Sequence, residues 1–188
     1  MEDKIIEAVI SSVEQSNHLF NKEEDFRIAV YNSLKLKFKN RCLIIPEYTY
    51  NGKSIDLLMS VDNEKYMIEL KYRTNGIKDY KAIVNNQTIN YEIKKQKLFY
   101  EYMMDVERIG NMFDDPNIQK AYAIMLTNIE EFNCKKVKEY PNKVAQKVDK
   151  KIITIKTKQK IKDECTEYSV KSNKFCKYGN FRLVITKS

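Results

Sequence analysis

SIDLLMSVDNEKYMIELKY, residues 54–72, has the pattern of two apolar β-strands joined by a tight turn at residues 62–63. Successive side chains of a strand point to opposite faces of a sheet, so Glu69 and Lys71 share one face of the second strand. A hairpin at this turn also brings Asp56, in the first strand, close to Glu69. Two carboxylates beside a lysine are groups that bind a hard divalent cation and a phosphate.

A second interpretation of the same residues is a solvated sheet face. An Asp followed by Glu-x-Lys also occurs by chance in lysine-rich proteins. However, a carboxylate and an ammonium in an apolar strand cost free energy unless both find partners. From these residues alone, a catalytic site and a solvated face both stay open.

The composition indicates one globular domain and favours a polyanionic partner. The chain has 188 residues, of which 32% are charged and 43% hydrophobic. This length is typical of a single domain with a sizeable core. The net charge of +8 favours nucleic acid as the first candidate partner and an acidic membrane surface as the second.

Several catalytic classes are excluded by what the sequence lacks. His18 is the only histidine, which argues strongly against a histidine-dependent triad and a multi-histidine metal site. The four glycines form no phosphate-binding loop. No transmembrane run or signal peptide is visible, so we expect a cytoplasmic protein. No CxxC pair or other metal spacing occurs, and reduced thiols are expected at Cys42, Cys134, Cys165 and Cys176.

Two amphipathic helices are expected before the first strand, at residues 3–17 and 21–38. Asn21 is a good N-cap for the second helix, with Glu24 at the capping-box position. Glu23 projects onto the apolar stripe of this helix. Its negative charge either stabilises the positive end of the helix dipole or reaches a cation in a neighbouring site.

Further elements follow from local patterns. Asn51-Gly52 is a strong hairpin signal. It joins an apolar strand at residues 42–50 to the two strands of residues 54–72. The three strands form a meander that ends at Arg73. Gln96 lies in a predicted helix and is read as a satisfied core polar group more readily than as a site residue. The other predictions are an irregular stretch at residues 74–88, that helix at 91–112, and a strand at 121–126 that is buried on both faces.

The region from residue 135 to 162 holds eleven lysines against Glu139 and Asp149. One interpretation is a solvated excursion, extending over about residues 132–180, with one strand around Ile152. The other is an arm that contacts phosphates, since lysines bind the nucleic-acid backbone without reading sequence. The chain closes with a predicted last strand at 181–186.

This order of elements resembles the PD-(D/E)XK nuclease superfamily, which has the restriction-endonuclease-like fold. The resemblance runs from about Asn21 to Thr127. The position before Asp56, a proline in the signature, is Ile55. More narrowly, the chain looks like a group of bacterial proteins of this fold, through KEEDFRIAVYNSL (22–34), MIELKYRT (67–74), YEYMMDVERI (100–109), AYAIMLTN (121–128) and YGNFRLVI (178–185).

The resemblance implies a single α/β domain over residues 1–188, with an αβββαβ core and a mixed central sheet flanked by helices. Asp56, Glu69 and Lys71 are then the signature catalytic triad. Glu23 matches the acidic residue of the first helix and joins the catalytic set. Auxiliary polar residues are implied in the helix after the motif, at Gln96, Tyr100, Asp105 and Arg108.

The implied activity is a Mg²⁺-dependent nuclease, most consistent with a DNA endonuclease. Asp56, Glu69 and the backbone carbonyl of Leu70 would hold Mg²⁺, with Mn²⁺ as a substitute. Lys71 would orient the attacking water and stabilise the developing charge. Nucleic acid, DNA before RNA, would contact Lys53, Arg73 and Lys94.

Two other functions stay open. A nuclease-fold module could bind nucleic acid or a protein partner without cleaving. A protein acting at membrane surfaces is less favoured, because no strongly basic amphipathic helix appears and no membrane partner is expected. Cutting both strands of a duplex usually takes two sites, which makes a homodimer plausible.

Overall fold

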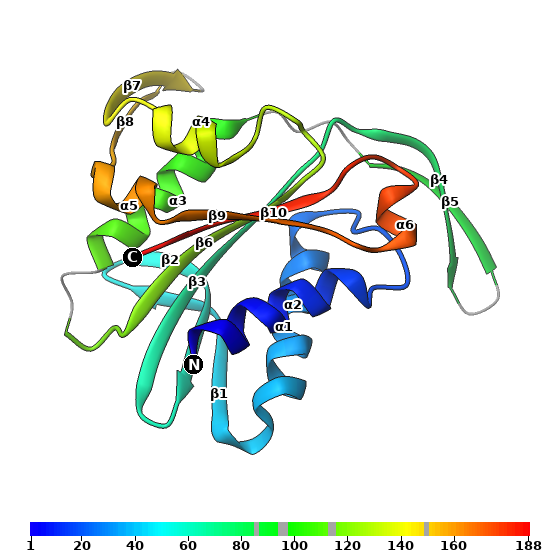
Figure 1. Cartoon of the computed structure of the whole chain (residues 1–188), viewed down its shortest axis with the longest axis horizontal. Helices are drawn as coiled ribbons and strands as arrows, with labels where there is room; N and C mark the ends of the chain where they lie inside the picture. The colour runs from blue at the N-terminus through cyan, green and yellow to red at the C-terminus, as the bar shows by residue number, and fades with distance from the viewer. Residues whose placement is uncertain (85–86, 94–97, 113–115, 149–150) are drawn as a thin grey trace.

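The computed structural model describes residues 1–84, 87–93, 98–112, 116–148 and 151–188. Its centre is a six-stranded mixed sheet flanked by helices (Figure 1). The strand order is β1-β2-β3-β6-β10-β9. Every neighbouring pair is antiparallel except β3 and β6, which run parallel. The protein is therefore a mixed α/β fold, as predicted.

The sheet strands are β1 (Cys42–Tyr50), β2 (Lys53–Val61), β3 (Glu64–Arg73), β6 (Lys120–Thr127), β9 (Cys165–Ser169) and β10 (Arg182–Lys187). The longer helices are α1 (Glu2–Glu14), α2 (Glu23–Phe38) and α3 (Phe99–Met112). Shorter helices are η1 (Lys39–Arg41), α4 (Cys134–Glu139), α5 (Gln159–Asp163) and α6 (Asn173–Cys176). Two separate hairpins consist of β4 (Ile77–Val84) with β5 (Gln87–Ile93), and β7 (Lys143–Val148) with β8 (Lys151–Lys156).

The β1–β2–β3 meander forms where the sequence predicts it. Both of its turns have two central residues with positive φ, at 47° and 73° for Asn51-Gly52 and at 49° and 69° for Asp62-Asn63. Two-residue hairpin turns of this type match the right-handed twist of the strands. Asn, Asp and Gly adopt positive φ at low cost, so these four residues determine the register of the meander.

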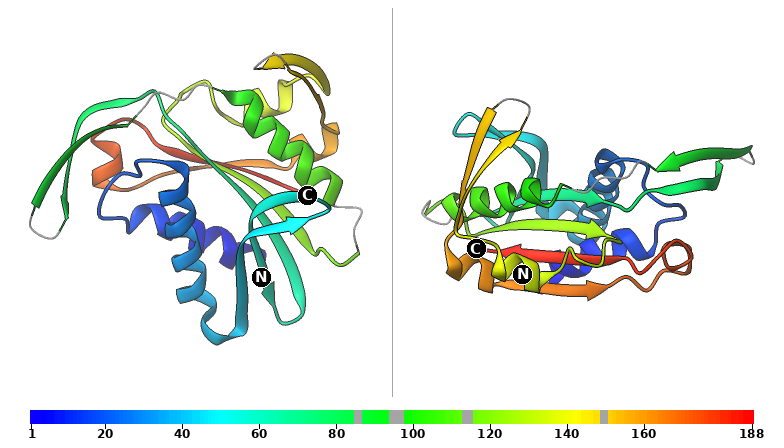
Figure 2. Two further views of the ribbon diagram at one scale, coloured as in Figure 1. Left: turned by 180° about the vertical axis from the view of Figure 1, so that it is seen from behind. Right: turned by 90° about the horizontal axis from the view of Figure 1, so that it is seen from above.

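The two faces of the sheet carry different helices. Ile68 and Leu70 of β3 belong to a core that includes residues of α1 and α2. Met67, one position out of phase, belongs to a second core formed with α3. In the left view of Figure 2, α3 crosses the side of the sheet that faces the viewer. Glu69 and Lys71 share the strand face of Met67 and therefore lie on the α3 side.

The predicted helix at residues 91–112 is wrong at its start, and the predicted irregular stretch before it is a hairpin. α3 begins at Phe99, and residues 77–84 and 87–93 form the β4–β5 hairpin, which extends away from the sheet (Figure 1). Ile93 is buried in the core that includes residues of α1 and α2. In sequence Ile89, Tyr91 and Ile93 alternate with polar residues, which is the two-residue period of a strand.

The start of α2 also differs in detail. The helix begins at Glu23, and Asp25 rather than Glu24 satisfies the free backbone groups. The carboxylate of Asp25 accepts hydrogen bonds from the N–H groups of Asn21 and Lys22 at 3.0 and 3.1 Å. The capping prediction was therefore displaced by one residue.

The lysine-rich region is structured rather than a plain excursion. It contains α4, the β7–β8 hairpin and α5, and then β9 as an edge strand of the main sheet. Cys134 and Cys165 form a disulfide, so the prediction of reduced thiols is wrong for these two. Cys42 and Cys176 are free thiols. Within the described residues, no helix is long and apolar enough to span a membrane.

Candidate active site

The site forms where β2 separates from β3. Their pairing runs from Val61 with Glu64 to Leu57 with Ile68 and then stops. β2 continues to Lys53, paired with β1 only. Residues 69–73 of β3 therefore have no strand on their β2 side within the described chain, and we call this segment the open edge. Backbone groups of alternate residues point to the same side of a strand.

Two carboxylates from different elements occupy the open edge. Oδ2 of Asp56 accepts a hydrogen bond from the N–H of Leu70 at 2.8 Å. Oε2 of Glu23 accepts one from the N–H of Tyr72 at 3.2 Å. Of the two roles open for Glu23, the structure supports contact with the site, although its position at the first residue of α2 also suits the helix dipole.

Lys71 lies at the centre of these charges. Its Nζ is 3.1 Å from Oε1 of Glu23, 3.3 Å from Oδ2 of Asp105 and 3.4 Å from the carbonyl oxygen of Leu70. Burial opposes the charged form, but the carboxylates of Asp105 and Glu23 outweigh it and raise the pKa of Lys71 above its ordinary 10.5. Lys71 is therefore a fixed cation at neutral pH rather than a proton acceptor.

Glu69 and Asp105 form a buried acidic pair on the α3 side. Each is 2% exposed. Glu69 forms an ion pair with Arg108, and Arg108 also lies 3.4 Å from Oδ1 of Asp105. Burial first, and then the charge of Asp105, raise the pKa of Glu69 to about 8. Burial likewise raises the pKa of Asp105, while Lys71 and Arg108 lower it. Arg108 and Lys71 are thus the basic partners of this pair.

Arginines on neighbouring elements complete the network. Arg27, one helical turn after Glu23 on α2, lies 3.4 Å from Oδ1 of Asp56 and 2.9 Å from Oε1 of Glu47. Arg73 is 5% exposed and pairs with Glu23 at 2.8 Å and with Glu101 of α3. Within the described part of the chain, each site carboxylate thus has at least one basic partner.

The remaining predicted residues have varied positions. Because Arg73 is buried between carboxylates, its predicted contact with nucleic acid would require those ion pairs to open. Lys53 is exposed at the start of β2. Tyr100 is half-buried, and its hydroxyl lies 3.4 Å from Oε1 of Glu101. Lys94 and Gln96 lie outside the described residues.

Residue-by-residue reasoning alone did not find every member of the site. Asp105 and Arg108 were implied only by the family resemblance. Arg27 and Glu101 were not predicted, although their spacing held a signal: Arg27 is four residues after Glu23, and Glu101 is four before Asp105. Residues at this separation lie on the same face of a helix.

The donor set is suitable for a hard divalent ion. Asp56, Glu69 and the carbonyl of Leu70 are all oxygen donors, the ligands that Mg²⁺ prefers, and Mg²⁺ keeps several waters of its own. Oδ2 of Asp105 is buried and lacks a well-aligned hydrogen bond, and Nζ of Lys71 at 3.3 Å is its ion-pair partner. No group of three or more His, Cys, Asp or Glu side chains in the described ranges is arranged to hold a metal. Two carboxylates, one carbonyl and water are thus the available ligands.

Comparison of the chain with family models, curated protein sequences and solved structures found no match. A functional assignment therefore has to be argued from the chemistry of the site itself.

Proposed function

We propose that the protein is a metal-dependent phosphodiester hydrolase, a nuclease acting on DNA, with a restriction-endonuclease-like fold. The observation that carries the proposal is the open edge of β3. There Asp56 accepts from the N–H of Leu70, Lys71 lies 3.4 Å from the carbonyl oxygen of Leu70, and Glu69 precedes Leu70 in the strand. The element order α2-β1-β2-β3-α3-β6, with β3 and β6 parallel, supports the fold assignment.

Mg²⁺ would be held by Asp56, Glu69 and the carbonyl of Leu70, with Mn²⁺ as a substitute. When bound, such an ion lowers the pKa of a coordinated water and polarises the phosphate. Glu69 has a reason to accept a cation, because burial and a neighbouring carboxylate raise its pKa well above the usual range. Without metal, Arg108 contacts Glu69, and Asp105 offers Arg108 a second partner when it leaves Glu69.

Lys71 would act on the phosphate rather than on the water proton. Its raised pKa keeps it positively charged, so it stabilises the negative charge that develops on the phosphate oxygens and orients the attacking water. The oxygen of that water bonds to phosphorus while the bond from phosphorus to the leaving sugar oxygen breaks. Glu23 and Asp105 contact the ammonium of Lys71 and are positioning residues.

A second candidate is a nuclease-fold module that binds nucleic acid or a protein without cleaving. One observation favours it: Asp56, Glu69 and Glu23 are already paired with Arg27, Arg108 and Lys71. A site whose carboxylates are paired with basic side chains has less need of a metal ion.

The test is a cleavage assay on duplex, single-stranded and branched DNA and on RNA, with Mg²⁺ or Mn²⁺. Wild type is compared with Asp56→Asn and Lys71→Met. Matched controls are Asp62→Asn, an exposed turn residue, and Lys65→Met, an exposed lysine on the same strand as Lys71.

We expect both site variants to lose at least about 100-fold in rate, as when a group that stabilises the transition state is removed. Both controls should cleave like wild type. Cleavage that persists in the site variants would mean that the reaction occurs elsewhere. Binding of DNA by wild type without cleavage of any substrate would favour the second candidate.

A further inference from the structure

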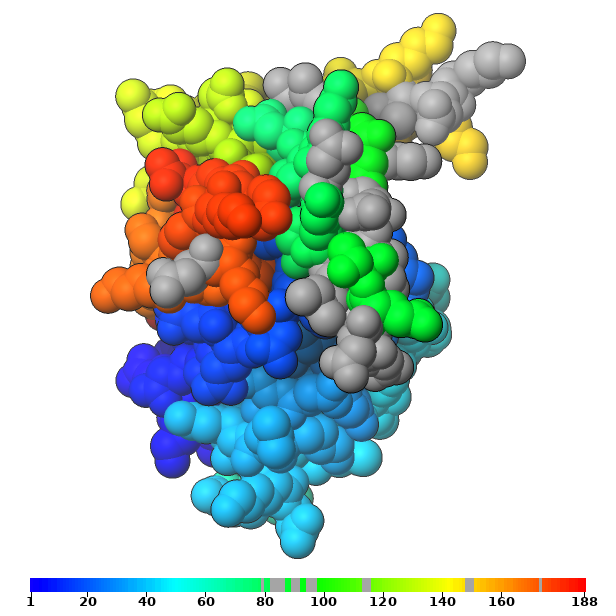
Figure 3. All heavy atoms as spheres, turned by 90° about the vertical axis from the view of Figure 1, so that its right-hand side faces the viewer, coloured from blue at the N-terminus to red at the C-terminus, as the bar shows by residue number. Residues whose placement is uncertain are grey.

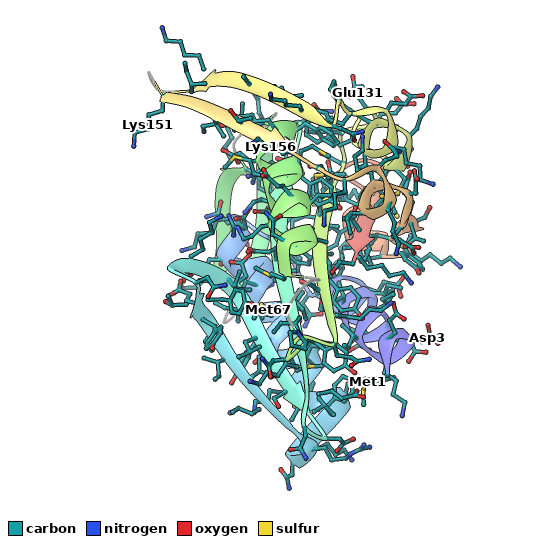
Figure 4. All side chains as sticks on the ribbon, turned by 90° about the vertical axis from the view of Figure 1, so that its left-hand side faces the viewer. Met1, Asp3, Met67, Glu131, Lys151 and Lys156 are labelled. Atoms are coloured by element: carbon teal, nitrogen blue, oxygen red, sulfur yellow. A yellow bond between two sulfur atoms is a disulfide. The ribbon has the colours of Figure 1, made fainter. Side chains whose placement is uncertain are left out.

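The β7–β8 hairpin is a basic ribbon that extends beyond the body of the protein. Residues 143–156 hold five lysines against one acidic residue, Asp149. Figure 3 shows β7 and β8, in yellow, projecting beyond the neighbouring surface. Lys151 lies at the outer end of the ribbon and Lys156 nearer the body (Figure 4).

The two faces of this ribbon differ sharply. Cross-strand partners share a face, and the pairs are Lys143 with Lys156, Ala145 with Thr154, and Lys147 with Ile152. All six of these residues are exposed. The alternate positions Val144, Gln146, Ile153 and Ile155 are half-buried or buried. One face therefore packs towards the protein, and the other, which we call the lysine face, is turned to solvent.

Among the residues that the structure describes, the lysine face has no partner. Lys143, Lys147 and Lys156 form no ion pair and no side-chain hydrogen bond with another described residue. Between them lie the small side chain of Ala145 and the side chain of Ile152, which is 77% exposed. Three unpaired cations around an uncharged centre are suited to a surface that carries regularly spaced negative charge.

The opposite face fixes the ribbon to the helix that forms one wall of the active site. Ile155 is 1% exposed and belongs to the core formed with α3. Nε2 of Gln146 donates to the hydroxyl of Tyr140 at 3.1 Å, and the ring of Tyr140 packs against Phe99, the first residue of α3. Lys162 of α5 donates to the carbonyl of Tyr140 as well. The ribbon is thus held in a defined position relative to the site.

We propose that the lysine face of the β7–β8 ribbon enters the major groove of double-stranded DNA, with its lysines on the phosphates and Ile152 towards the base edges. This inference rests on the proposed function, for which it names a docking element and the duplex form of the substrate. It converts one of the two sequence interpretations of this region, an arm that contacts phosphates, into a defined surface.

The dimensions of the ribbon favour DNA over RNA. Its two strands lie about 4.8 Å apart, and the four residue steps from Lys143 to Lys147 span about 13 Å. The major groove of B-DNA is about 12 Å wide and admits a two-stranded ribbon. The major groove of A-form RNA is deep and too narrow for side chains to read. An apolar side chain such as Ile152 can also contact the thymine methyl group, which RNA lacks.

The test measures binding without cleavage, by fluorescence anisotropy with a short DNA duplex in EDTA over a range of salt concentrations. The triple variant Lys143→Gln, Lys147→Gln, Lys156→Gln removes the lysine face. A matched triple variant, Lys4→Gln, Lys39→Gln, Lys65→Gln, removes the same net charge from exposed positions elsewhere.

We expect the lysine-face variant to bind at least about tenfold more weakly near physiological salt, and its plot of log K against log salt to lose about 2.7 in slope, at about 0.9 per phosphate contact. The matched variant should keep the slope of wild type. Ile152→Ser should weaken binding without changing the slope. Dimethyl sulfate should show guanine N7 protected by wild type and not by the lysine-face variant, since N7 lies in the major groove.

Three results would overturn the inference: unchanged binding by the lysine-face variant, an equal loss in the matched variant, or an equal dependence on the lysine face for duplex RNA. Thermal melting of each variant checks that it is folded. The cleavage assay separates this inference from the proposed function. If DNA binding depends on the lysine face but no substrate is cleaved, the nuclease proposal fails and the inference about the ribbon stands. If DNA is cleaved but binding does not depend on the lysine face, the nuclease proposal stands and the inference about the ribbon fails.

Discussion

Replacing the buried Glu69 with glutamine should stabilise the metal-free protein at pH 7. Glu69 is 2% exposed, and burial followed by the charge of Asp105 raises its pKa from 4.5 to about 8. Between these two values the folded state binds more protons than the unfolded state. The free energy of unfolding therefore falls as the pH rises through this range. Glutamine has nearly the same shape and carries no charge to neutralise.

The size of the effect follows from the pKa difference. At pH 7 the carboxyl of Glu69 is ionised in the unfolded state and mostly protonated in the folded state. The free energy of unfolding is therefore lowered in proportion to the difference between pH 7 and the ordinary pKa of 4.5, which is 2.5 pH units. One unit corresponds to about 1.4 kcal/mol, so 2.5 units cost about 3–4 kcal/mol. The variant loses the contact of Glu69 with Arg108, although Arg108 keeps Asp105 as a partner. Allowing for that lost contact, we expect Glu69→Gln to raise the free energy of unfolding by about 2–3 kcal/mol.

Urea denaturation in EDTA, followed by circular dichroism from pH 5 to 9, measures this directly. The stability of wild type should fall with rising pH up to about pH 8, and that of Glu69→Gln should fall less. Glu107→Gln is the control, because it makes the same change at a half-buried position on α3. A variant that is less stable than wild type at pH 7, with the same pH slope, would refute the reasoning. The pair with Arg108 would then outweigh the cost of burial.

Three further predictions concern metal, core and disulfide. Mg²⁺ at 100 times its dissociation constant should stabilise wild type by about 2.7 kcal/mol, which a higher melting temperature would show. Asp56→Asn should not show this rise. An unchanged melting temperature in wild type would contradict the metal site. Tyr102→Phe should lower the free energy of unfolding by about 1–3 kcal/mol in urea denaturation, because this fully buried hydroxyl lies within hydrogen-bond distance of the carbonyl oxygens of Ala123 and Val184. An unchanged free energy of unfolding would mean that those carbonyls find other partners. Reducing the Cys134–Cys165 bond, which closes a separation of 31 residues, should cost about 3–4 kcal/mol by loop entropy. The melting temperature of a double serine variant should not respond to reductant, and an equal response would place the effect elsewhere.

Local signals determined most of the meander, and the sequence was sufficient there. The turns at residues 51–52 and 62–63 combine residues that tolerate positive φ, and the strands between them are apolar. The helix prediction for the segment before α3 was wrong because Ile93 fits both a helical and a strand period. Only the packing of Ile93 against the core selects the strand. Long-range pairing of cysteines leaves no local pattern, so the disulfide was not predictable.

The site was predictable in its signature but not in its electrostatics. Asp56, Glu69 and Lys71 follow from strand alternation and one turn. That Arg108 pairs with Glu69 depends on how α3 lies against β3, which is a tertiary contact. No periodicity in the sequence carries that information, and the shifted pKa of Glu69 is likewise a consequence of packing.

The open edge of β3 also affects how the protein behaves among copies of itself. Unpaired N–H and C=O groups of a strand are a template on which a strand from another chain can add. Asp56 and Glu23 each occupy one N–H of this edge and put negative charge where an incoming strand would lie. The same two carboxylates thus suppress intermolecular strand addition. Loss of both carboxylates is therefore expected to leave this edge open to a strand from another copy.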